Sequence, residues 1–246
     1  MKRAMILSTV CLALAGCSVV PQTSYDRSAG FAAQSNTFAA PANRTSASVA
    51  PARARIASAA PIASNAAAAQ CLNQLGSAGV RFEALPDQYR DQGCSTLGTV
   101  QMHALQGDSG RLNISNLGPV TCPVSTAFAA WVRFGVDRAA QEILGTRLAS
   151  VQTMGSYSCR NVAGTDRRSG HATGTAIDIG GFVLADGRVI SVESGWDGSA
   201  DEREFLRVVQ RSACRRFGTV LGPDYNAAHR DHFHVEGVID GNSYCR

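Results

Sequence analysis

The sequence predicts an α+β domain in which a small antiparallel β-sheet is flanked by helices, stapled by disulfides and preceded by a disordered tether. Three observations support this prediction. Helical and strand-like hydrophobic patterns both occur after residue 71, and they come in runs of each kind. Six cysteines lie in the same region. The residues before it are rich in alanine and carry too little apolar bulk to bury a core.

Length and charge restrict the classes of function. The chain has 246 residues, 45% of them hydrophobic, which suffices for one sizeable core or two small ones. The formal net charge is +4, but residues 71–246 carry 17 Arg against 18 Asp and Glu. Because a nucleic-acid-binding domain usually has an excess of basic charge, we expect no nucleic-acid partner. No run of 18 apolar residues occurs, so no spanning helix is expected.

The N-terminus has the features of an export signal followed by an anchor. A basic start precedes an uncharged run from Ala4 to Gly16, which suits a signal-peptide core and is short for a transmembrane helix. The run closes on Leu14-Ala15-Gly16-Cys17, which resembles the lipobox of bacterial lipoproteins. This resemblance implies a lipoprotein signal peptide over residues 1–16 and a lipid on Cys17. The alternative is an ordinary signal peptide that happens to contain a cysteine.

Lipidation implies a location in the cell envelope. The mature protein is then expected in the periplasm, held to a membrane only through its lipid, with the outer membrane as the expected destination. Residues 17–70 are predicted to be the lipidated cysteine and a disordered Ala/Ser/Pro linker, since residues 31–70 contain 17 alanines in 40 positions. Only Ala66–Ala69 is expected to begin a helix, which leads into the domain over residues 71–246.

Three helices are predicted in this domain. The long helix begins near Pro123 and shows apolar residues at helical spacing. The last helix begins with a capping box, Ser199 and Glu202, and its apolar stripe is expected to extend to Phe217. Each helix is expected to end at a glycine. The predicted helices span residues 71–79, 123–145 and 199–218.

Strand patterns fill most of the intervals between the helices. Residues 80–83 alternate before a proline, and the turn Asp186-Gly187 favours a hairpin between the strands on either side of it. The last strand carries two histidines. The predicted strands span residues 80–83, 151–157, 176–184, 188–192 and 232–238.

Six of the eight cysteines are expected to form three disulfides. Cys11 leaves with the signal peptide, and Cys17 is assigned to the lipid. An even number of cysteines in an exported chain indicates an oxidising compartment. No C-x-x-C motif occurs, which argues against a zinc ribbon. Spacing alone leaves all fifteen pairings open. The six are Cys71, Cys94, Cys122, Cys159, Cys214 and Cys245.

The residues that carry chemistry lie in and near two of the predicted strands. In the first strand, alternation turns Ile177 and Ile179 towards the core and Asp178 to the opposite face. His171 lies seven residues before Asp178, in a glycine-flanked turn that can fold back towards it. In the second strand, His232, His234 and Glu236 share the face opposite Phe233 and Val235.

If the two strands lie side by side, imidazole and carboxylate groups converge. Two histidines and one carboxylate with a water in the fourth position form a catalytic zinc site, although such ligands also suit iron and other divalent metals. A structural zinc would instead take a fourth protein ligand, His229 or His232. Four of the five histidines lie in these two stretches, which favours a shared site.

A family resemblance rests on these motifs. The pattern Ser169-x-His171-x-x-Gly174-x-Ala176-x-Asp178, with a later His232-x-His234, resembles zinc peptidases that cut D-amino-acid bonds in peptidoglycan. These include D-Ala-D-Ala carboxypeptidases and dipeptidases, lysostaphin-type endopeptidases and the penicillin-insensitive murein endopeptidase. As a whole, residues 71–246 are similar to the bacterial extensin-like C-terminal domain. The segments that carry this similarity are residues 155–160, 176–179, 217–226 and 229–234.

The resemblance to the peptidases implies roles for individual residues. His171, Asp178 and His234 match the zinc ligands, and His232 matches the active-site histidine. Asp231 occupies the position at which the carboxypeptidases have a glutamate base, whose side chain is one methylene longer.

Further residues are matched less closely. The spacing His229-x-x-His232-x-His234 is similar to that of the murein endopeptidase, and either His229 or Asp231 is expected to orient His232 or to replace it as the base. The resemblance also implies that Ser169 and Arg160 bind substrate. Arg160 is the nearest match to an arginine that the carboxypeptidases carry upstream. The resemblance also implies the disulfides Cys71–Cys94, Cys122–Cys159 and Cys214–Cys245.

The function implied is that of a zinc-dependent peptidoglycan peptidase of the DD-carboxypeptidase or endopeptidase type. Its substrate would be a peptide stem of peptidoglycan, and its nucleophile a water activated by Zn²⁺. The alternative is a non-catalytic module that binds or scaffolds peptidoglycan and carries a zinc site.

Overall fold

The computed structural model describes residues 66–246. The predicted signal peptide, Cys17 and most of the predicted linker lie outside the described residues. Helix α1 (Ala66–Ser77) begins where the alanine run predicts a helix start and ends before Gly79, which has a left-handed φ of 74°. No helix within residues 66–246 has the length and apolar character needed to cross a bilayer.

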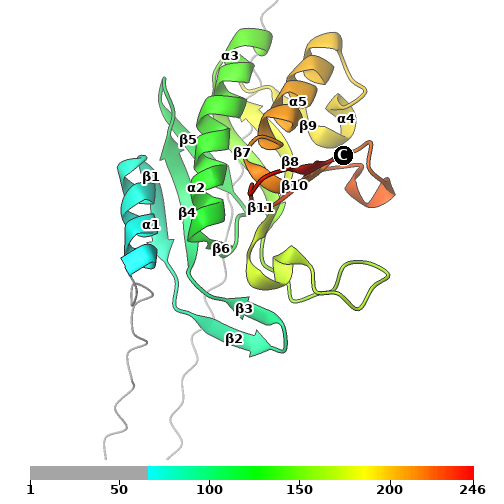
Figure 1. Cartoon of the computed structure of the whole chain (residues 1–246). Coiled ribbons are helices and arrows are strands. Elements are labelled where there is room, and N and C mark those ends of the chain that lie inside the picture. The colour runs from blue at the N-terminus through cyan, green and yellow to red at the C-terminus, as the bar shows by residue number, and fades with distance from the viewer. Residues whose placement is uncertain (1–65) are drawn as a thin grey trace, which may run out of the picture. The chain divides into compact units, whose positions relative to one another are not determined.

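The strands form one large sheet and one hairpin. They are β1 (Val80–Ala84), β2 (Gln88–Asp91), β3 (Cys94–Thr96), β4 (Thr99–Gln106), β5 (Arg111–Ser115), β6 (Val120–Thr121), β7 (Leu148–Gly155), β8 (Ala176–Leu184), β9 (Val189–Ser191), β10 (Phe217–Leu221), β11 (Phe233–Val238) and β12 (Tyr244–Cys245). The large sheet has the order β1-β4-β5-β7-β8-β11-β10-β12, with β6 beside β4 and β9 beside β8. Its pairs are antiparallel except β5–β7 and β10–β12. β2 and β3 form a separate two-stranded sheet (Figure 1).

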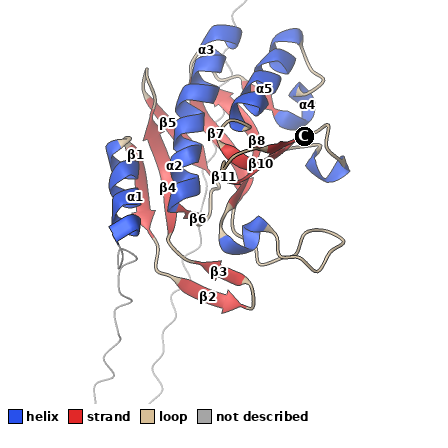
Figure 2. Ribbon diagram, viewed as in Figure 1, coloured by secondary structure: helices blue, strands red, loops and turns tan. Residues whose placement is uncertain are grey.

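Helices cover one face of the large sheet (Figure 2). The predicted helix over 123–145 is present as α2 (Cys122–Trp131), a π-helical segment η1 (Val132–Asp137) and α3 (Arg138–Leu144). Helix α5 (Ala200–Ala213) has the expected capping box, and a short α4 (Val192–Gly195) precedes it. The α+β class, with flanking helices and three disulfides, is therefore confirmed.

Trp131 joins the helices to the sheet. This residue is fully buried at the end of α2, and its Nε1–H donates to the Val209 carbonyl at 3.1 Å and to Ser212 Oγ at 3.0 Å, both on α5. Its ring also meets Phe182 of β8 and Phe217 of β10, with centroids 6.3 and 6.2 Å away. The core thus fixes α2 and α5 against the central strands.

The end of the last helix differs from the prediction. Helix α5 ends at Ala213, and Phe217 begins strand β10, where it pairs with Val238. Its ring is fully buried against Trp131 even so. The helical spacing of Phe217 was therefore misleading, because a turn at residues 214–216 returns the chain to the same core from the sheet side.

Two of the three expected disulfide pairs are wrong. The bonds are Cys71–Cys122, Cys94–Cys159 and Cys214–Cys245, so only the last agrees with the prediction. Cys71 pairs with Cys122 because α1 packs against the start of α2. Cys94 pairs with Cys159 because the β2–β3 hairpin lies along the loop after β7, where Arg168 also donates to the Gln92 carbonyl.

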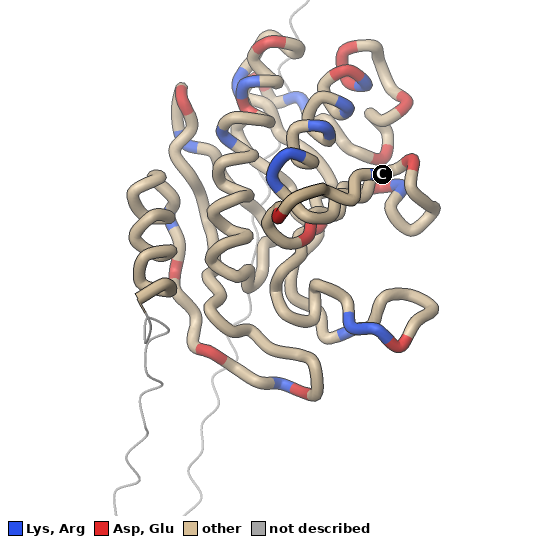
Figure 3. Tube along the Cα trace, viewed as in Figure 1, with Lys and Arg blue, Asp and Glu red and all other residues tan. Residues whose placement is uncertain are grey.

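Charges are distributed unevenly among the helices. Figure 3 shows basic and acidic residues along α5 and on the loops, whereas α1 and α2 carry none. Both signs occur together on α5, which begins with Asp201 and Glu202 and has Arg211 in its last turn. This order of charges complements the helix dipole.

Candidate metal centre

Asp178 and His234 face each other at the centre of the sheet. Strands β8 and β11 are antiparallel, and their register pairs Asp178 with His234. Because side chains alternate along a strand, both residues point to the face opposite the core. This is the arrangement that the sequence predicts. The alternating residues that point into the core are at most 1% exposed: Ile177, Ile179, Phe233 and Val235.

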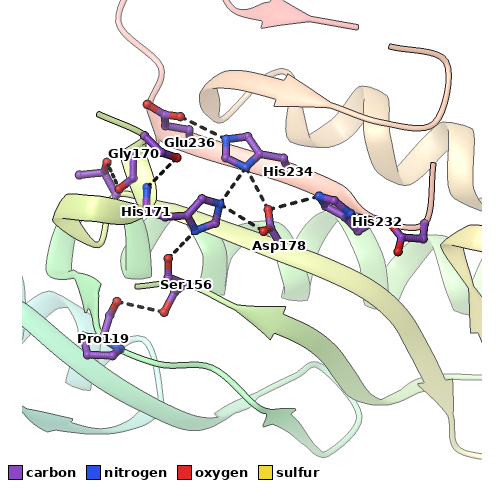
Figure 4. A network of polar contacts seen from close by, with 11 residues as sticks. Pro119, Ser156, Gly170, His171, Asp178, His232, His234 and Glu236 are labelled. Atoms are coloured by element: carbon purple, nitrogen blue, oxygen red, sulfur yellow. Dashed lines mark hydrogen bonds and ion pairs between the residues drawn. The ribbon is translucent and has the colours of Figure 1, made fainter. Parts of the chain in front are cut away.

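His171 reaches the same point from the turn before β8. It lies in a 3₁₀ turn, η2 (Gly170–Thr173), which ends at Gly174 with a left-handed φ of 65°. Ser169 caps the turn, and its Oγ accepts a hydrogen bond from the His171 backbone N–H at 3.4 Å. Ser169 is buried, and its side chain shapes the turn that carries His171. The His171 ring is folded back onto Asp178 and His234 (Figure 4).

The three side chains have the spacing that a small divalent cation requires. His171 Nε2 lies 3.2 Å from Asp178 Oδ2 and 3.2 Å from His234 Nδ1, and His234 Nδ1 lies 2.9 Å from Asp178 Oδ1. Ligand atoms about 2.0–2.1 Å from a tetrahedral zinc are about 3.3–3.4 Å apart. The three residues therefore need to move outward only slightly to hold such an ion, and the donor set suits zinc.

Hydrogen bonds on the far side of each ring orient the two histidines. His171 Nδ1 makes a very short contact with the Ser156 carbonyl, and His234 Nε2 lies 3.1 Å from Glu236 Oε2. Because these partners only accept, each of those nitrogens carries the hydrogen, and a neutral ring then presents its other nitrogen to the site. The sequence placed Glu236 on this face without assigning it a role, and it gave no role to Ser156. Glu236 could have been predicted as a partner of His234, because residues two positions apart on a strand lie on the same face.

The carboxylates of the site and His234 shift one another's pKa values towards their charged forms. Burial alone would raise the pKa of Asp178, but hydrogen bonds with His171 and His234 outweigh this and hold it well below its usual range. Burial would lower the pKa of His234, whereas the carboxylates of Asp178 and Glu236 raise it to about 9. Because a metal-ligating histidine nitrogen must be deprotonated, metal binding at His234 is expected to compete with protons.

His232 lies at the edge of the three-residue cluster. Its Nε2 is 3.6 Å from Asp178 Oδ1, and its Nδ1 is 2.8 Å from Asp231 Oδ1. The hydrogen bond with His232 is the main cause that lowers the pKa of Asp231. Asp231 is therefore a charged residue that fixes the His232 ring, and Nε2 is the nitrogen that faces the site.

The other residues implied by the resemblance lie further out. The His229 ring is tilted by 42° against the His232 ring, with the two ring centres 5.2 Å apart, and its Nδ1 is 2.8 Å from Asn226 Oδ1. Burial, with a smaller contribution from neighbouring positive charges, lowers the pKa of His229 to about 4. The side chain of Arg160 is exposed, and its positive charge is one of those that act on His229. Neither residue approaches the three candidate ligands as closely as His232.

Replacing Glu236 by glutamine should weaken metal binding without removing it. The amide still offers an oxygen to His234 Nε2 but withdraws the negative charge, so zinc affinity should fall about 10-fold, at the lower end of the range for partners of metal-bound histidines. Competition with a chromogenic chelator measures this. An exposed carboxylate, Glu193, provides the matched control Glu193→Gln. Unchanged affinity of Glu236→Gln would show that Glu236 does not support the site.

Two comparisons with known proteins, one against curated proteins and one against solved structures, find no match. A comparison with protein families does find one. The family described as extensin-like protein C-terminus matches residues 69–246, which include the strands and the three disulfides of the described part of the chain and the three candidate metal ligands. Since this match covers well over half of the chain, the chain belongs to the extensin-like protein C-terminal family.

Proposed function

We propose that the protein is a zinc-dependent peptidoglycan peptidase of the cell envelope. The observation that carries the proposal is the convergence of His171, Asp178 and His234 beside a fourth side chain, His232, whose Nε2 faces the same point. Three protein ligands with one open position are characteristic of catalytic zinc sites, whereas structural sites are closed by four. The motifs shared with the peptidases that cut D-amino-acid bonds support the choice of substrate.

The residues of the chain divide the chemistry between them. His171, Asp178 and His234 would hold the zinc ion, which when bound supplies a Lewis acid that activates a water nucleophile and polarises the scissile carbonyl. His232 Nε2 accepts the proton of the attacking water and returns it to the leaving amine. Asp231 holds the His232 Nδ1–H, so that Nε2 is kept free for this transfer. Asp231 is thus a positioning residue in this mechanism rather than the base.

The N-terminal residues extend the proposal to the cell envelope. A lipid on Cys17 would anchor the protein to a membrane, most simply the outer membrane facing the periplasm. The linker that follows would let the domain reach the peptide stems of the wall. The support for this part is the sequence pattern, since residues 1–65 lie outside those that the structure describes.

The test is to replace His232 by glutamine and to incubate each protein with purified peptidoglycan. Zinc content should stay near one ion per chain, because the three ligands are retained, while peptide release should slow by about 10²–10⁴-fold. Liquid chromatography of the soluble products measures the release. His103, an exposed histidine on β4, provides the control His103→Gln.

Two results would contradict parts of the proposal. If the parent protein binds zinc and peptidoglycan but releases no peptide, it is a wall-binding module. If His232→Gln hydrolyses as fast as the parent, proton transfer does not pass through His232.

A further inference from the structure

A row of aromatic rings leads outward from the metal centre. The His229 ring lies 5.8 Å from His234, the Tyr225 ring lies 5.4 Å from His229, and the Tyr244 ring lies 6.2 Å from Tyr225. The two tyrosines are 40% and 47% exposed, although each is in contact with the next ring. Together they form an exposed tyrosine pair beside the site. Neither tyrosine has a role in the metal centre described above.

The loop that carries Tyr225 is fixed to the core. Asp224 Oδ1 accepts a hydrogen bond at 2.8 Å from Nε1 of Trp196, a residue that is 4% exposed. The Tyr225 backbone N–H donates to the Gly222 carbonyl at 2.9 Å, and the Gly222 N–H donates to the Arg246 carbonyl at 3.0 Å. The backbone from which the Tyr225 ring projects is therefore set by contacts within the chain.

Tyr244 is fixed from the other side. Strand β12 runs parallel to β10 with Tyr244 opposite Thr219, and the neighbouring Cys245 is bonded to Cys214. The Arg246 guanidinium lies 4.9 Å from the centre of the Tyr244 ring. The two rings stand at 89° to each other, so a flat ligand that stacks on one ring meets the edge of the other. Because the backbone at both tyrosines is fixed by contacts within the chain, such a ligand would not have to order the backbone.

The chemistry and size of the tyrosine pair favour a sugar ring. A pyranose has flat apolar C–H faces that stack on aromatic rings, and polar groups at its edge that Tyr hydroxyls and the Arg246 guanidinium can hydrogen-bond. Two tyrosines are too small an area for a stable protein partner, which needs about 1,000 Å² or more of buried surface. The mixed apolar and donor character of the pair also fits a neutral sugar better than an apolar peptide side chain.

The distance from the metal centre fits the substrate of the proposed function. Successive ring centres along this row are about 6 Å apart. The distance from His234 to Tyr244 is therefore no greater than three such steps. An extended peptide of about five residues has the same reach at ~3.3–3.6 Å per residue. A stem peptide in peptidoglycan is a chain of this order of length whose far end is joined to an amino sugar.

We propose that Tyr225 and Tyr244 form a subsite for the amino sugar that carries the stem peptide. This inference rests on the proposed function, since it names the part of the substrate that lies beyond the scissile bond. It makes the protein selective for peptides that are still attached to glycan. Free stem peptides would occupy the metal centre alone.

Binding measurements test the subsite separately from catalysis. The background is His232→Gln, so that ligands are not turned over, and the probes are a soluble disaccharide–peptide from digested peptidoglycan and the same peptide without its sugars. In this background the sugar-bearing probe should bind about tenfold more tightly than the sugar-free peptide in calorimetry. Replacing both tyrosines, Tyr225→Leu with Tyr244→Leu, should abolish that advantage. The control Tyr89→Leu, on β2 and 83% exposed, should keep it.

The outcomes separate the two proposals. Equal affinity for both probes, no binding of either, or an advantage that survives in the Tyr225→Leu, Tyr244→Leu variant would overturn the sugar subsite. If the sugar preference depends on both tyrosines but the parent protein cleaves no peptide bond, the peptidase proposal fails and the sugar subsite stands.

Discussion

Replacing Asp178 by asparagine should remove the bound zinc and with it all measurable peptide hydrolysis. The Asp178 carboxylate lies within 3.2 Å of both candidate histidine ligands, so it is the negative charge around which the site is built. Asparagine has the same shape but no charge. We therefore expect zinc affinity to fall by more than the ~10–100-fold that replacement of an orienting partner costs. Zinc content after dialysis against a weak chelator measures this effect.

The matched control is Asp186→Asn. Asp186 is an exposed carboxylate in the turn between β8 and β9, where it pairs with Arg188. This variant should keep its zinc and its activity. Near-identical circular dichroism spectra of the two variants would show that both are folded. An Asp178→Asn protein that retains about one zinc ion and full activity would rule out the metal centre described here.

Replacing Trp131 by alanine should lower the free energy of unfolding far more than replacing its exposed neighbour Phe134. The change deletes a fully buried indole that contacts α5, β8 and β10, and the expected cost is about 3–5 kcal/mol of the free energy of unfolding. Trp131→Phe should cost less, because Ser212 Oγ still donates to the Val209 carbonyl at 2.8 Å when the indole N–H is absent. Urea titration with disulfides intact and zinc chelated measures both variants without a contribution from metal binding.

Phe134 provides the control for this experiment. It lies in the same helical region, three residues after Trp131, but its ring is 42% exposed and is flanked by the guanidinium groups of Arg133 and Arg138. Phe134→Ala should change the free energy of unfolding by less than about 1 kcal/mol. A similar loss in Trp131→Ala and Phe134→Ala would mean that the indole does not hold the helices to the sheet.

The sequence was most informative where structure depends on neighbouring residues. Alternation in residues 176–180 and 233–236 correctly predicted which side chains turn away from the core, although β11 begins at Phe233 and so leaves His232 just before the strand, and the Ser199 capping box marked the start of α5. These features depend on local periodicity and on hydrogen bonds between residues a few positions apart. The convergence of Asp178 and His234 followed because the two strands were assumed to pair.

Most of the missed features depend on contacts between residues far apart in the sequence, although β5, whose residues alternate between exposed and buried, was missed despite a local signal. Strand β4 was not predicted because Thr99 and Val100 are both fully buried, which breaks the alternation expected of a strand with one buried face. The partners of Cys71 and Cys94 depend on which elements pack together, and spacing carries no such information. Likewise, the Ser156 carbonyl that orients His171 belongs to a segment whose sequence has no polar side-chain motif for this role.

The direct pairing of Asp178 with His234 has a consequence for how such proteins can diverge. Two of the candidate ligands are fixed by the register of central strands, whose other faces are packed into the core. The tyrosine pair, by contrast, belongs to a loop and to the chain end. Mutations can therefore alter these outer residues while the register that places Asp178 beside His234 stays intact. The candidate metal centre is thus under a tighter structural constraint than the surface beside it.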